Sequence, residues 1–149
     1  MPNTGISSPK NTGLEIDHNR LETRRKTDMA VVHHTGNPWD DDLSAAEIDA
    51  SHKAQGWTCI GYHYVIRKDG TVEQGRPHWT VGAHAYGPNS HTIGIHVCGN
   101  FEEAEPTDQQ IESLAMLLAN LCTDYGLPID RDHIVGHRAL KTTCWRCDK

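Results

Sequence analysis

The chain has 149 residues, of which 36% are apolar and 23% are charged, and its net charge is −6 when histidine is neutral. The length fits one domain with a hydrophobic core, and the negative charge argues against a general nucleic-acid-binding surface, which needs clustered lysine and arginine. No apolar run approaches the roughly 18 residues of a membrane span, and residues 1–13 lack the apolar segment of a secretory signal, so we expect a chain that is cytoplasmic as synthesised and does not insert into a membrane.

Residues 1–27 are predicted to form a flexible polar arm, and residues 28–149 a single domain. Gly, Ser, Pro and Asn are frequent at the start of the arm, and the basic residues Arg24, Arg25 and Lys26 stand near its end. We expect these three cations to be solvated, with substrate binding as the less favoured alternative. The five cysteines are expected to be reduced thiols or metal ligands.

A short apolar run at residues 29–32 is predicted to be a buried strand that ends at His33 and His34. Successive side chains of a strand point to opposite faces, so only one of the two histidines is expected to face a site. Taken alone, a histidine at a strand end is more often structural than functional.

Ser44 and Glu47 have the spacing of a capping box and predict a helix that runs to about Gln55, with Gly56 as its cap. The alternating pattern that follows, with a turn signal at residues 68–70, predicts a β-hairpin within residues 61–74.

Two tyrosines of this hairpin, Tyr62 and Tyr64, are expected to share one face. On the pattern alone, such aromatic residues are more often core than catalytic.

The β-branched run at residues 92–97 is predicted to be a central strand, in which His96 packs against its neighbours. Thr107 and Gln110 form a second capping box, which predicts a helix to about Tyr125. The apolar face expected for this helix consists of Ile111, Leu114, Leu118, Leu121 and Cys122.

A last short strand is predicted at residues 134–135, just before His137. The order strand, helix, hairpin, strand, helix, strand indicates an α/β fold with a central mixed sheet flanked by helices.

The residues that follow the first and last strands have the chemistry of zinc ligands. His137 comes after the last strand as His33 and His34 come after the first, and Cys144 and Cys147 follow within ten residues. Two histidines and one cysteine would leave a coordination position for water, whose pKa zinc lowers to about 7. A tyrosine hydroxyl such as that of Tyr62 could stabilise the developing oxyanion. These residues would suffice for a zinc hydrolase site, but their spacing alone does not favour that interpretation, and the HExxH motif is absent.

Five segments in order carry a more specific signal: VVHHTG, GWTCIGYHYVIRKDGTVEQGRP, VGAHAYGPNSHTIGIHVCGNF, the helix start PTDQQ, and HIVGHRAL. With these the chain resembles the type 2 family of zinc-dependent N-acetylmuramoyl-L-alanine amidases, which includes phage endolysins and peptidoglycan recognition proteins. The resemblance implies the fold of that family, Zn²⁺ as cofactor, and hydrolysis of the amide between N-acetylmuramic acid and L-alanine. It implies peptidoglycan, glycan strand plus stem peptide, as partner, and we expect a monomer.

The resemblance also implies roles for single residues. His33 and His137 would be zinc ligands, Tyr62 would assist the attacking water, and Thr143 would stabilise the oxyanion. Three further residues would contact the substrate: His84, His34 and Asn89.

The chain departs from the family pattern after His137. The family places its cysteine eight residues beyond this histidine and follows it with Pro-Gly, whereas here Trp145 holds that position and no Pro-Gly follows. Cys144 is the favoured third ligand and Cys147 the alternative, and the C-terminus resembles a truncated version of the family's.

Three functional readings stay open beside an endolysin that acts on the cell wall after release. One is a cytoplasmic amidase that recycles muropeptides, and another is a peptidoglycan-binding module without catalysis. The least favoured is a redox pair formed by Cys144 and Cys147.

Overall fold

The computed structural model describes residues 9–10, 13–34, 42–85, 88–99, 105–130 and 132–136. The predicted order of strands and helices is confirmed, with two short 3₁₀ helices in addition. The elements are η1 (His18–Arg20), β1 (Met29–His34), α1 (Ala45–Ala54), β2 (Tyr64–Ile66), β3 (Val72–Gln74), η2 (Pro88–His91), β4 (Thr92–Val97), α2 (Asp108–Tyr125) and β5 (Ile134–Gly136).

The strands form one mixed sheet in the order β3-β2-β4-β1-β5. The hairpin strands β2 and β3 are antiparallel, whereas β4 pairs in parallel with β2 and β1, and β1 pairs in parallel with β5. The predicted central strand is therefore the middle strand of the five. In the pairing of β1 with β4, His33 lies opposite His96, so these two histidines come from adjacent strands at the same edge of the sheet.

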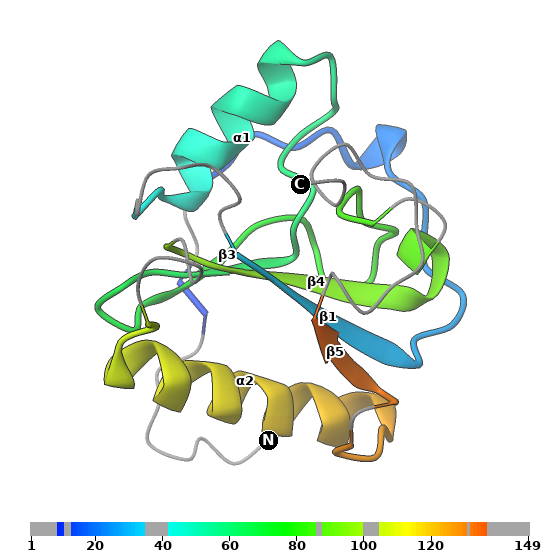
Figure 1. The fold of residues 1–149 in the computed structure, drawn as a ribbon. Coiled ribbons are helices and arrows are strands. Elements are labelled where there is room, and N and C mark those ends of the chain that lie inside the picture. The colour runs from blue at the N-terminus through cyan, green and yellow to red at the C-terminus, as the bar shows by residue number, and fades with distance from the viewer. Residues whose placement is uncertain are drawn as a thin grey trace.

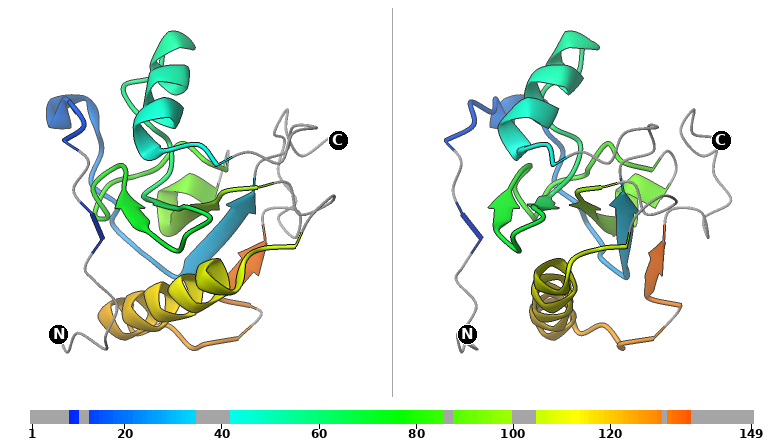
Figure 2. Two further views of the ribbon diagram at one scale, coloured as in Figure 1. Left: turned by 90° about the vertical axis from the view of Figure 1, so that its left-hand side faces the viewer. Right: turned by 60° about the vertical axis from the view of Figure 1, so that its left-hand side comes forward.

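The two faces of the sheet carry different elements (Figures 1 and 2). Helix α2 covers one face, where strand residues such as Tyr64 and Ile95 pack against Leu117 and Leu121. On the other face, Ala45 and Ile48 of α1 pack with a cluster that includes Tyr62. The α1 face carries Tyr62, whose ring lies next to those of His33 and His96.

Both predicted capping boxes are present. The side chains of Ser44 and Thr107 accept hydrogen bonds from the third residues of their helices, whose side chains bond back to the cap backbone. Gly126 ends α2 in the left-handed conformation, with φ of 66°, which glycine adopts without steric cost. These local signals were sufficient to predict where each helix begins.

The buried face of α2 differs from the prediction at its first turn. Ile111 was expected to be buried but is 53% exposed, and its neighbour Gln110 is buried instead. The Gln110 side-chain nitrogen donates to the Cys98 carbonyl at 2.8 Å. Because a buried carbonyl at a strand end needs a donor, the polar side chain turns inward there.

The described part of the N-terminal arm lies against the domain (Figure 2). Lys10 bonds through its backbone to both Val72 and Gln74 of β3. The expectation of three solvated cations is wrong for Arg24, which is buried and donates to the Thr80 carbonyl at 2.6 Å and to the Tyr125 hydroxyl at 3.1 Å. Arg25 and Lys26 are exposed. The boundary at residue 28 stays a prediction.

His63 connects the central strand to the loop that follows β3. Its Nδ1 accepts a hydrogen bond from the Gly94 backbone at 3.0 Å, and its Nε2 lies 2.8 Å from the Thr80 carbonyl. A carbonyl only accepts, so Nε2 carries the proton and the ring is neutral. Burial, together with the nearby positive charges of Arg24 and Arg76, lowers the pKa of His63 to about 3.

We expect this histidine to make folding pH-dependent. Its pKa in the unfolded chain is about 6.5, so between this value and the lower folded pKa the unfolded state binds more protons. The free energy of unfolding should therefore fall as pH decreases, by about 2 kcal/mol between pH 7.5 and pH 5. Urea titrations at both pH values measure this term as the difference between the protein and the His63→Asn variant. Equal pH dependence in both would contradict it.

Candidate functional site

The two histidines at the end of β1 lie on opposite faces of the sheet, as the strand period predicts. His34 follows Val32 at a spacing of two, and Val32 packs in the cluster under α2. His33 therefore points to the α1 face, where it is 4% exposed. Among the described residues, the ring of His33 lies beside another imidazole ring, that of His84.

Around His33 the α1 face holds a cluster of four histidine rings and one tyrosine ring: His33, His52, Tyr62, His84 and His96. The Nε2 atom of His33 lies 2.9 Å from Nδ1 of His84. The Tyr62 ring lies 5.1 Å from the His33 ring and 4.8 Å from the His96 ring, between centroids. All five side chains are buried, and they come from β1, α1, β4 and two loops.

The position of Tyr62 is set by hydrogen bonds from outside the sheet. Its backbone carbonyl accepts from the Arg76 backbone at 2.9 Å. The two preceding residues donate through their backbones to α1: Ile60 to Asp49 at 2.8 Å and Gly61 to His52 at 2.9 Å. These bonds fix the chain just before β2 begins.

The expectation that Tyr62 and Tyr64 share a face is wrong. Tyr64 packs under α2, whereas Tyr62 lies on the α1 face. Strand alternation applies only from Tyr64 onward, because β2 starts there.

His84 is held in a slot over the central strand. A β-carbon on Gly94 would lie 2.5 Å from Cδ2 of the His84 ring, and one on Gly82 would lie 2.7 Å from the same atom. Such distances are too short for carbon atoms, so the ring can occupy this place only because both residues are glycines. The side-chain oxygen of Asn89 accepts from the backbones of His84 and Ala85 at 2.9 and 2.8 Å, which fixes the loop around the ring.

We expect Gly94→Ala to displace His84 and to lower the free energy of unfolding by about 1–3 kcal/mol, the usual cost of overpacking. Gly136→Ala is the matched control, since none of the heavy atoms that the structure describes lies within 4 Å of a β-carbon there. Urea denaturation of both variants measures the difference. Equal stabilities would show that the slot is not tight.

A row of hydrogen bonds leads from η2 to His33. The Thr92 hydroxyl donates to the Pro88 carbonyl at 2.9 Å, and the same oxygen lies 3.2 Å from Nε2 of His84. The other ring nitrogen of His84 faces His33. The alternation in TIGIHV places Thr92, Gly94 and His96 on the α1 face, and this spacing was the signal by which sequence reasoning could have added Thr92 and Gly94 to the site.

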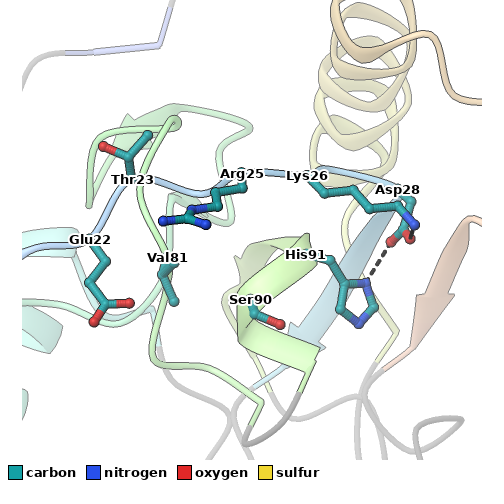
Figure 3. A pocket seen from close by; sticks show the side chains of 8 residues that line it. All are labelled: Glu22, Thr23, Arg25, Lys26, Asp28, Val81, Ser90 and His91. Atoms are coloured by element: carbon teal, nitrogen blue, oxygen red, sulfur yellow. Dashed lines mark hydrogen bonds and ion pairs between the residues drawn. The ribbon is translucent and has the colours of Figure 1, made fainter.

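A cavity of about 510 Å³ lies at the other end of the same strands (Figure 3). Asp28 and His91, which precede β1 and β4, are hydrogen-bonded to each other beside it. None of the predicted site residues that the structure describes line it; the described lining is Glu22, Thr23, Arg25, Lys26, Asp28, Val81, Ser90 and His91. The candidate site therefore lies at the opposite, carboxyl end of these strands.

Four predicted site residues lie outside the described part of the chain: His137, Thr143, Cys144 and Cys147. Within the described ranges, no three His, Cys, Asp or Glu side chains are placed to hold a metal ion. His33 is the one predicted ligand that the structure describes, so the metal set stays a prediction.

Comparison with known proteins gives a consistent result. The family model described as N-acetylmuramoyl-L-alanine amidase matches residues 23–147. The endolysin of Escherichia phage T7 is 36% identical over 130 residues, which is 84% of each chain. The endolysin N-acetylmuramoyl-L-alanine amidase LysCS of Clostridium intestinale superposes with a TM-score of 0.82 at 34% identity, covering 95% of this chain and 88% of LysCS.

A more distant likeness concerns the fold alone. Drosophila PGRP-LB superposes with a TM-score of 0.74 at 24% identity, over 88% of this chain and 81% of its own.

In the described residues, no helix is long and apolar enough to cross a membrane.

Proposed function

The chain belongs to the N-acetylmuramoyl-L-alanine amidase family and is a peptidoglycan amidase, and on this premise we propose that it cleaves the bond between N-acetylmuramic acid and L-alanine with the help of Zn²⁺. The proposed ligands are His33, His137 and Cys144, with Cys147 as the alternative to Cys144. We further propose that it acts as an endolysin.

The observation that carries this proposal is the position of His33. It is buried at the carboxyl end of β1, with its ring beside Tyr62 and hydrogen-bonded to His84. One residue earlier, Val32 pairs with Gly136 of β5, and His137 is the next residue in the sequence. His33 and His137 each directly follow one residue of this pair, and consecutive Cα atoms are about 3.8 Å apart. The pairing therefore supports a site shared by the two histidines.

The donor set fits zinc, because imidazole nitrogen and thiolate sulfur are its common protein ligands and three of them leave a position for water. A zinc ion bound there would supply Lewis acidity and a water of lowered pKa.

The Tyr62 ring lies beside the His33 ring, 5.1 Å away between centroids, which supports a role for Tyr62 in the reaction. We assign to its hydroxyl a hydrogen bond to the water or to the developing oxyanion, and to Thr143 a second donor for the oxyanion. Because three backbone hydrogen bonds fix the segment before β2, the Tyr62 ring is preorganised rather than ordered by the substrate.

His34, His84 and Asn89 are proposed to contact the substrate. For Asn89 the side-chain oxygen is already used within its loop, which supports a contribution through the shape of that loop. His84 is the residue through which this loop reaches His33.

Digestion of purified sacculi tests the proposal. The zinc-loaded protein should release new L-alanine amino termini, a chelator such as 1,10-phenanthroline should stop the release, and added Zn²⁺ should restore it. Cys144→Ser should lose zinc and activity while Cys147→Ser keeps both, and the reverse would move the thiolate to Cys147. A zinc-loaded protein that binds sacculi and leaves muramyl peptides intact would contradict catalysis and indicate a binding module.

A further inference from the structure

The hydrogen bonds that end at His33 can be assigned a direction, starting from Thr92. Its hydroxyl has one proton, and the Pro88 carbonyl, 2.9 Å away, can only accept it. The Thr92 oxygen must therefore accept from Nε2 of His84. A neutral His84 with a proton on Nε2 has its lone pair on Nδ1, which then accepts from Nε2 of His33.

From this direction we infer that Thr92 and His84 are positioning residues that fix the tautomer of His33. With its proton on Nε2, neutral His33 has its lone pair on Nδ1, and Nδ1 is the atom we assign to the metal. This inference rests on the proposed function, since it concerns how the chain prepares His33 as a zinc ligand. Histidine ligands in proteins commonly donate their other ring N–H to a partner that sets their orientation.

The surroundings make the arrangement a rigid one. Thr92 is fully buried and His84 is 7% exposed, so water does not replace either hydrogen bond easily. The slot formed by Gly82 and Gly94 holds the plane of the His84 ring. Reversing the direction would require the Thr92 hydroxyl to donate to His84, and the Pro88 carbonyl would lose the donor that the structure gives it.

The metal-free protein tests the tautomer directly. Long-range ¹H–¹⁵N correlation spectra distinguish a protonated from an unprotonated ring nitrogen, and the signals of His33, one of eleven histidines, are assigned by their loss in His33→Ala. We expect His33 to carry its proton on Nε2. A wild-type His33 protonated on Nδ1 would overturn the inference.

Substitution of Thr92 tests the consequence for metal binding. Thr92→Val removes the hydroxyl at nearly constant shape, so His33 should become a mixture of tautomers and zinc affinity should fall about 10- to 100-fold. Thr92→Ser keeps the hydroxyl, so it should retain the wild-type tautomer of His33 and the wild-type zinc affinity. Thr80→Val is the matched control: Thr80 is equally buried and also donates to a proline carbonyl, that of Pro77 at 2.7 Å, but its hydroxyl has no hydrogen bond to a histidine ring in the described structure.

The outcomes separate this inference from the proposed function. If Thr92→Val keeps the wild-type tautomer and zinc affinity, or if Thr80→Val loses as much affinity, the positioning role is wrong while the zinc amidase stands. If the wild type binds no zinc, the proposed metal site is wrong, and the spectra of the metal-free protein still decide the tautomer of His33.

Discussion

Replacing His33 by alanine is expected to abolish zinc binding and to lower kcat/KM for peptidoglycan by more than about three orders of magnitude. The physical reason is that the chain would lose the means to lower the pKa of a water from its high value in bulk solvent to near 7. Zinc content after dialysis, by elemental analysis, and release of L-alanine amino termini from sacculi measure the two effects. A circular dichroism melt checks that the variant is folded.

His34→Ala is the matched control for this experiment. It removes the same side chain one residue later on the same strand, but from the face covered by α2. We expect it to keep its zinc and to retain turnover, with a change confined to substrate affinity. Loss of zinc in His34→Ala with retention in His33→Ala would exchange the proposed roles of the two residues.

Replacing Tyr62 by phenylalanine is expected to lower kcat by about 10²- to 10³-fold, the usual effect of removing one donor to an oxyanion. Only an oxygen atom is lost, so the ring contacts with His33 and His96 should remain. Zinc content and melting temperature should therefore stay at wild-type values. Steady-state kinetics on soluble muramyl peptides separate kcat from KM.

Tyr64→Phe is the control for Tyr62→Phe. Tyr64 is also a buried tyrosine, only two residues away, but it packs under α2, and burial raises the pKa of its hydroxyl to about 12. We expect its removal to leave kcat unchanged. A similar loss of kcat in both variants would mean that the effect of Tyr62→Phe comes from packing rather than from its hydroxyl.

The sequence was sufficient for those features that depend on local spacing. Capping boxes at Ser44 and Thr107 are short-range hydrogen-bond patterns, so the helix starts could be predicted from residues three apart. Strand alternation relates neighbouring residues, so it correctly predicted that His33 and His34 lie on opposite faces. The order of the elements then followed from the hydrophobic pattern.

Features that depend on distant partners could not be predicted in this way. Arg24 is buried where it donates hydrogen bonds to acceptors that lie 56 and 101 positions away in the sequence. A run of three cations gives no indication of these partners. Tyr62 leaves the strand pattern because α1 and Arg76 hold its segment. The assignment of a proton to His33 depends on the Pro88 carbonyl, which no spacing rule connects to a histidine 55 positions earlier.

Strand β5 is an edge strand of the sheet and directly precedes the proposed ligand His137. Zinc would therefore affect the local stability of this strand as well as catalysis. The strand has three residues, pairs with β1 alone among the described strands, and is at most half-buried. On the proposed ligand assignment, zinc would join His33 to the residue directly after this strand, closing a loop of about one hundred residues. The metal-free protein should then exchange the amide hydrogens of β5 first, and zinc should slow that exchange. Zinc binding would thus make the enzyme catalytically active and would also protect strand β5 from local unfolding.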